Sequence, residues 1–150
     1  MKKTIIFVKC LIFLLLAGNV LAESPSIGKV KGTRGLVSVI RSGKTIPLLP
    51  GMPVMLDDVL LTGSDGAVGL LLDDNTLLSI GPISRLALNK FDFSPATNKY
   101  AMQLGMQKGT IVYRSGMLGK LAPHMVTMET PVGTISMLKE SNFMAKFDGE

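Results

Sequence analysis

The chain has 150 residues, which is enough for one domain rather than two. Its 16 lysines and arginines outnumber its 11 acids, but three of the lysines lie within residues 1–22, and from residue 23 onward the count is 13 against 11. This balance lacks the concentrated basic footprint of a nucleic-acid-binding protein. The chain has no tryptophan, and only six phenylalanines and tyrosines follow residue 22, too few for a base-stacking platform. We therefore expect no nucleic acid partner.

Residues 1–22 have the pattern of a secretory signal peptide. Lysines follow Met1, an apolar stretch covers residues 5–17, and Val20 and Ala22 stand at positions −3 and −1 of a cleavage site. The alternative is a retained membrane anchor, but the uncharged run over residues 10–22 has 13 residues, against about 20 for a helix that spans a bilayer. We predict cleavage after Ala22 and a periplasmic or secreted bacterial protein, which touches a membrane only if the signal peptide stays uncleaved.

The single cysteine, Cys10, lies in the apolar part of this leader. Cleavage leaves no thiol, which excludes a disulfide, a cysteine nucleophile and thiolate ligation of a metal in the mature chain. An exported chain of this size can rely on a hydrophobic core in place of disulfides.

The mature chain has the pattern of an all-β domain. Residues 23–27 are expected to form a short flexible segment. From residue 28, short apolar runs alternate with Gly, Pro, Asp and Asn, and helical periodicity is missing. About ten short strands are predicted, over residues 35–41, 45–49, 59–62, 67–72, 76–80, 85–89, 100–107, 110–114, 125–129, 132–137 and 143–147. We expect the domain over residues 28–147, as a two-sheet sandwich or a β-roll or solenoid-like arrangement, and a C-terminal tail over 148–150.

Two runs predict how the strands are covered. Residues 100–107 alternate apolar with small or polar side chains, which is typical of a half-buried strand. The leucines at 70–72 and 77–78 do not alternate, which predicts strands covered on both faces.

Nine of the ten methionines follow the leader, at positions 52, 55, 102, 106, 117, 125, 128, 137 and 144. Met102 and Met106 share a predicted strand face with Tyr100 and Leu104, so we expect methionine to fill gaps in the core. The alternatives are an adaptable binding surface and a soft-metal site.

The sequence offers few candidates for catalysis. Residues 42–45 (Ser-Gly-Lys-Thr) resemble the end of a phosphate-binding loop, but Ser38 replaces the upstream glycine and Pro47 excludes the helix that must follow. We predict a turn there. His124 is the only histidine, so a Ser-His-Asp triad would have to use it. No serine, however, lies in the Gly-x-Ser-x-Gly motif typical of a nucleophile. We place His124 in a loop or at the start of a strand.

Two acidic pairs, Asp57-Asp58 and Asp73-Asp74, offer carboxylates for acid–base chemistry or for calcium. Adjacent strand residues point to opposite faces, and both pairs stand where aspartate caps a turn, so we predict turn residues. Lys29, Lys31 and Arg34 form a small basic group that either touches an anionic lipid or glycan or lies on a solvated edge.

Several segments, in their order and spacing, resemble those of the FecR-like domain, an exported bacterial β-rich module. They are residues 27–30, 35–39, 56–63, 67–77, 80–82, 84–86, 109–112 and 130–134, with Gly51. The resemblance covers residues 28–147, and it implies the fold and an envelope location. The best-known members of the family signal from an outer-membrane transporter to a cytoplasmic sigma factor. We carry over only the fold and the compartment, because a cleaved chain cannot reach the cytoplasm.

The chain departs from the family pattern near its end. The family commonly has Arg-Gly-Thr before an aromatic residue, and here Ser136 to Phe143 lacks it, with the aromatic displaced by one residue. We therefore carry over no role from the family to the stretch from Leu138 to Phe143.

Taken together, these features predict a non-enzymatic exported domain with no catalytic, cofactor-binding or metal-binding residue. We expect it to bind another envelope protein or polymer. Such binding could serve envelope sensing or signalling. One mode of recognition is the addition of a partner strand to a sheet edge. The alternatives are a structural or adhesive envelope protein and, third, a hydrolase that uses Asp58 and Asp74.

Overall fold

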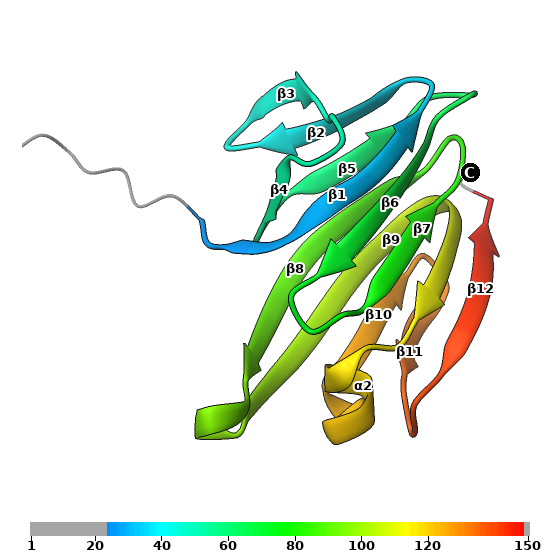
Figure 1. Cartoon of the computed structure of the whole chain (residues 1–150). Helices are drawn as coiled ribbons and strands as arrows, with labels where there is room; N and C mark the ends of the chain where they lie inside the picture. Colours follow the sequence, from blue (N-terminus) through cyan, green and yellow to red (C-terminus); the bar gives the residue numbers. More distant parts are fainter. Residues whose placement is uncertain (1–23, 149–150) are drawn as a thin grey trace, which may run out of the picture.

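The computed structural model describes residues 24–148, and β-strands dominate them (Figure 1). Within that range it has one α-helix, α2 (Met117–Leu121), and two 3-10 helices (Pro95–Thr97 and Pro123–Met125). The all-β class predicted from the sequence is confirmed. The predicted signal peptide with Cys10, its cleavage site and residues 149–150 of the predicted tail lie outside the described residues.

The described residues form twelve strands: β1 (Ser26–Arg34), β2 (Val37–Arg41), β3 (Lys44–Pro47), β4 (Pro53–Met55), β5 (Val59–Thr62), β6 (Ala67–Leu72), β7 (Leu77–Ile80), β8 (Arg85–Ser94), β9 (Lys99–Arg114), β10 (Val126–Thr130), β11 (Gly133–Ser136) and β12 (Asn142–Phe147). β1 and β4 were not among the predicted strands. Lysine and glycine in β1 give it a weak strand pattern of its own, and its pairing with β4 and β6 makes it a strand.

The start of β1 corrects the predicted flexible segment over residues 23–27. Ser26 and Ile27 belong to the strand, and Ile27 is buried in the core. Burial of this one isoleucine removes apolar surface from water and so fixes the beginning of the domain.

The twelve strands form one sheet that curls around a single core, rather than two separate sheets. Along the sheet the order is β3-β2-β5-β8-β9-β7-β6-β1-β4. In addition, β10 pairs with the first half of β9, β11 pairs with β10, and β12 pairs with the second half of β9. All of these pairings are antiparallel except that of β9 with β10. The sheet has one half on the β8 side of β9 and another on the β7 side. Buried side chains from both halves, such as Leu60 of β5 and Leu70 of β6, belong to one hydrophobic cluster.

The long strand β9 joins the two halves, and Gly109 is the point of change. Residues up to Lys108 pair with β8, whereas Ile111 and the residues after it pair with β7. Gly109 has φ +96°, and a Cβ there would lie 2.0 Å from Oγ of Ser84. Only glycine fits both this conformation and this close approach, so the two strands predicted over 100–107 and 110–114 are one bent strand.

The leucine runs are covered on one face only, which corrects the prediction. β6 alternates between buried Leu70 and Leu72 and half-buried Leu71, and in β7 Leu78 is buried while Leu77 is half-buried. The second face of these strands has no layer packed over it in the described chain, so Leu71 and Leu77 contribute to its surface.

The stretch that lacks Arg-Gly-Thr leads into β12. Leu138 is 88% exposed, whereas the ring of Phe143 stacks on that of Tyr113 with 5.2 Å between centroids. The displaced aromatic residue therefore serves to hold the last strand against β9.

Candidate binding face

The first acidic pair forms a turn, as predicted. Asp57 has φ +67° and is exposed, whereas Asp58 is 1% exposed. Arg41 donates two hydrogen bonds to the Asp58 carboxylate, from Nε at 2.8 Å and from Nη2 at 2.7 Å, and the Met55 N–H donates a third at 2.8 Å. These contacts occupy both carboxylate oxygens and fix the β4–β5 corner.

The second acidic pair also forms a turn, between β6 and β7. The Asp74 carboxylate is fully buried and accepts hydrogen bonds from the Thr76 N–H (3.0 Å), the Thr76 hydroxyl (2.7 Å) and the Leu118 N–H (3.1 Å). Asp73 is exposed and points elsewhere. Asp74 thus ties α2 to the turn, and its carboxylate is enclosed by the fold.

Tyr113 lies on β9 near this turn and is 1% exposed. Burial, with the negative charge of Asp74 in addition, raises the pKa of the Tyr113 hydroxyl above its ordinary value. The hydroxyl is therefore neutral at physiological pH, and it packs as part of the core.

The other candidates lie apart. Ser42 and Gly43, with φ +50° and +75°, form the two-residue turn of the β2–β3 hairpin, so the predicted turn is confirmed. His124 is exposed in a 3-10 turn directly before β10, as expected for a loop residue. Across residues 24–148, His, Asp and Glu side chains do not gather in threes around a point where a metal ion would fit.

The methionines divide between the core and the surface. Four of them are buried in the hydrophobic cluster, which confirms the core prediction for Met102, Met106, Met128 and Met137. Met117, Met125 and Met144 are at least 40% exposed, with Met144 at 72%. The exposed methionines are therefore surface features, and Met144 belongs to the face described next.

A face of mixed basic and aliphatic side chains covers the outer side of β1, β6, β7, β9 and β12. The pairing registers place Lys29 beside Leu71, Leu71 beside Leu77, and Leu77 beside Arg114. Residues opposite one another in neighbouring strands lie on the same face. Strands are about 4.8 Å apart, so Lys29 and Arg114 stand about 14 Å apart across the sheet, with the two leucines between them.

The next row of the same face completes it. Ser79 lies beside Val112, and Val112 beside Met144, while Lys146 follows along β12. A Cβ on Gly69 would meet Cβ of Lys31, which places Lys31 on the same side. We call this surface the basic–apolar face; it consists of Lys29, Lys31, Leu71, Leu77, Val112, Arg114, Met144 and Lys146.

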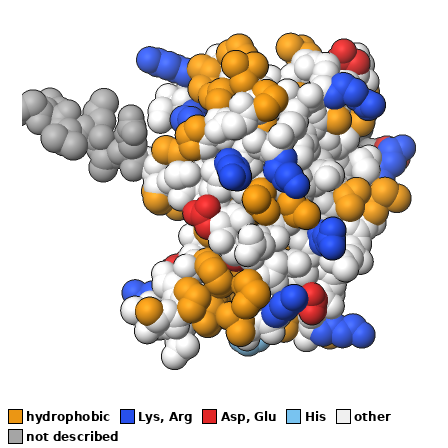
Figure 2. All heavy atoms as spheres, viewed as in Figure 1, with side chains coloured by type: hydrophobic (Ala, Val, Ile, Leu, Met, Phe, Trp, Pro, Cys, Tyr) orange, Lys and Arg blue, Asp and Glu red, His pale blue; other side chains and the backbone are white. Residues whose placement is uncertain are grey.

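The charge of this face has one sign. None of the residues of β1, β4, β6, β7, β9 and β12 is acidic, and Asp73 and Asp148 directly follow the ends of β6 and β12. Figure 2 views the molecule as Figure 1 does, and over β1, β6 and β7 it shows blue cationic side chains interspersed with orange hydrophobic ones. A surface of this kind attracts acidic groups and offers apolar area for burial beside them.

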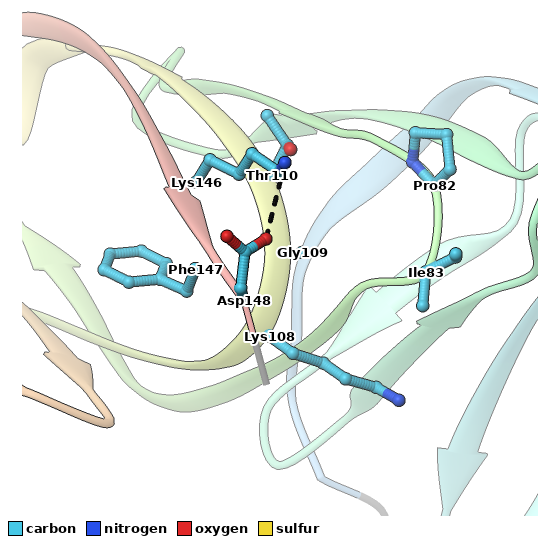
Figure 3. Close-up of a pocket in the computed structure, with 8 residues that line it drawn as sticks. All are labelled: Pro82, Ile83, Lys108, Gly109, Thr110, Lys146, Phe147 and Asp148. Atoms are coloured by element: carbon cyan, nitrogen blue, oxygen red, sulfur yellow. Dashed lines mark ion pairs between the residues drawn. The ribbon is translucent and has the colours of Figure 1, made fainter. Parts of the chain in front are cut away.

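A groove of about 490 Å³ opens at one end of the face. Pro82 and Ile83 lie across it from Lys146 and Phe147, and Lys108 also lines it (Figure 3). Lys146 also contacts Asp148 at the rim, with 3.4 Å from Nζ to Oδ1. The groove thus has the same composition as the face, with apolar side chains beside two lysines.

The sequence indicated only part of this face. Lys29 and Lys31 were singled out as a basic group with Arg34, and the structure puts all three exposed along β1. It adds Arg114 and Lys146 from strands far away in the sequence. The alternation within residues 110–114 and 142–147 marks outward positions, but it does not say which strands they lie beside.

Neither a family model, nor a curated protein, nor a solved structure gives a significant match to the chain. In the part of the chain that the structure describes, no helix has the length and apolar character needed to cross a membrane.

Proposed function

We propose that the protein is an exported, non-enzymatic binding module of the FecR-like kind, which recognises another component of the bacterial cell envelope through the basic–apolar face. The observation that carries the proposal is the composition of that face. Cations surround exposed aliphatic side chains, and the strands that form the face contain no acidic residue.

A protein partner suits this face better than a polymer. Val112 and Met144 are 41% and 72% exposed, and covering them would release water from apolar surface. A hydrophilic polyanion would pair with the lysines but would leave this aliphatic surface uncovered. A protein surface with apolar residues at its centre and acids around them matches both properties, as protein interfaces combine an apolar core with a polar rim.

The non-enzymatic role is supported by the state of the candidate carboxylates. Asp58 and Asp74 are both buried and engaged by three hydrogen bonds each. Neither lines the groove beside the basic–apolar face. The export and the family assignment rest on the leader pattern and on the order of sequence segments described above.

Crosslinking in intact bacterial cells that express the full chain, followed by mass spectrometry, tests the proposal. We expect an adduct with an envelope protein, reduced about tenfold or more when Lys29→Glu and Arg114→Glu are combined, because like charges then face the acidic partner. The matched control combines Lys44→Glu and Lys90→Glu, which reverse two exposed lysines on β3 and β8, outside the face, and should keep the adduct.

Three outcomes contradict the proposal. Recovery of a free monomer alone from wild-type cells leaves the face without a partner. An equal loss of the adduct in the control variant reduces the effect to overall charge. Self-assembly of the purified protein at micromolar concentration in sedimentation, with no other component bound in cells, supports the structural or adhesive alternative.

A further inference from the structure

Ile83 adopts a backbone conformation that isoleucine avoids. Five non-glycine residues within residues 24–148 have positive φ, and four of them are Ser42, Asp57, Asn75 and Asn98. Serine, aspartate and asparagine are small polar residues that turns commonly use there. Ile83, with φ +51°, is the β-branched exception. In the left-handed region a β-carbon collides with the backbone, and a branched one more so.

The corner around Ile83 is tightly held. The Ile83 N–H donates to the carbonyl of Gly63 at 3.0 Å, and the Ser84 N–H donates to the Thr62 hydroxyl at 2.8 Å. The Ser84 hydroxyl donates to the carbonyl of Gly81 at 2.8 Å. These bonds on both sides of Ile83 impose its conformation, which is the circumstance in which backbone strain persists.

The side chain of Ile83 contributes little to the stability of the fold. Ile83 is 56% exposed, so most of its apolar surface faces water rather than the core. It lines the groove that ends the basic–apolar face, across from Lys146 and Phe147 (Figure 3). An isoleucine that costs backbone strain and stays exposed is explained when a partner covers it.

We infer that Ile83 is the apolar anchor of the partner contact, and that it inserts into an apolar pocket that acidic side chains surround on a protein partner. The inference rests on the proposed function and deepens it. The charge of the groove selects the acidic surround, since Lys108 and Lys146 line it and only Asp148 opposes them. Anchors of this kind dominate the binding energy of many interfaces.

The first test measures stability. Ile83→Asn relieves the strain, so the ratio of folded to unfolded protein in urea should rise by a factor of about 5 to 30. Ile83→Gly should also raise it. Leu49→Asn is the matched control, because Leu49 is 57% exposed and does not have positive φ; it should change the ratio by no more than about twofold. A loss of stability in both Ile83 variants overturns the inference, since Ile83 would then serve the fold.

The second test measures contact in intact cells. A photoreactive amino acid in place of Asp148, which is exposed at the rim of the groove, keeps Ile83 and both lysines. The expected adduct is a protein peptide in which apolar residues have Asp or Glu within a few positions. Ile83→Asn should reduce this adduct at least fivefold and Leu49→Asn should leave it unchanged. A mapped adduct to lipid, to glycan, to a second copy or to a peptide without acids overturns the inference.

The two proposals fail in different ways. If the double variant of Lys29 and Arg114 loses the partner while Ile83→Asn keeps it, the anchor is wrong and the binding face stands. If wild-type protein gives no adduct from the groove or the face, both are wrong.

Discussion

Replacement of Asp74 by alanine should destabilise the domain severely. The carboxylate is 0% exposed and accepts three hydrogen bonds, two from Thr76 and one from the N–H of Leu118. A hydrogen bond to a charged group contributes about 1.5 kcal/mol or more, and a buried donor left without its acceptor costs a similar amount. For three such bonds the loss from Asp74→Ala is therefore about 4.5 kcal/mol, a large part of the 5 to 15 kcal/mol that stabilises a typical domain.

Equilibrium unfolding in urea, followed by circular dichroism, measures this loss. Asp74→Asn keeps one acceptor oxygen but turns an amide N–H₂ towards the remaining donors, so it should fall between wild type and Asp74→Ala. The matched control is Asp73→Ala, whose side chain is exposed next to it in the sequence, and it should stay within about 0.5 kcal/mol of wild type.

A loss of stability below about 1 kcal/mol in Asp74→Ala, with an unchanged dependence on urea, would contradict this expectation. That result would mean that water or a shifted α2 replaces the carboxylate at little cost, and that the β6–β7 turn does not depend on it.

Three further perturbations test the fold. Arg41→Ala leaves the carboxylate of Asp58, 1% exposed, without its cation, and thermal unfolding should show a loss of about 3 kcal/mol. Gly109→Ala combines φ +96° with a Cβ only 2.0 Å from Ser84, and urea unfolding should show a loss of about 3 kcal/mol. Because the pKa of Tyr113 is raised above 10.0, the unfolded chain loses this proton first. Its contribution to stability is present below pH 10 and lost above it, so wild type should weaken there more steeply than Tyr113→Phe.

Each of these expectations has a contradicting result. An Arg41→Ala protein as stable as wild type would mean that solvent reaches Asp58. A Gly109→Ala protein with unchanged stability would mean that β9 bends elsewhere. Parallel alkaline curves for wild type and Tyr113→Phe would mean that Tyr113 ionises equally in both states.

The class of the fold and most of its turns could be predicted from residue patterns along the chain. Turn residues act through their own backbone, so the pattern at residues 42–43, 57–58 and 73–75 could be interpreted locally. Apolar runs between such turns also predict strands locally, because a strand pattern can be recognised from a few neighbouring residues. The burial of Met102 and Met106 followed from their alternation with polar neighbours.

Which strands lie side by side depends on contacts that form only in the folded domain. The sequence does not show that β9 bends at Gly109, or that Leu71 and Leu77 face outward, because both depend on partners many residues away. The basic–apolar face combines Lys29 with Lys146, which no local pattern connects. Ile83 was missed because nothing in its side chain signals positive φ; the bonds of the surrounding corner impose it. Turns follow from local chemistry, whereas a face follows from strand register, which packing of the whole chain sets.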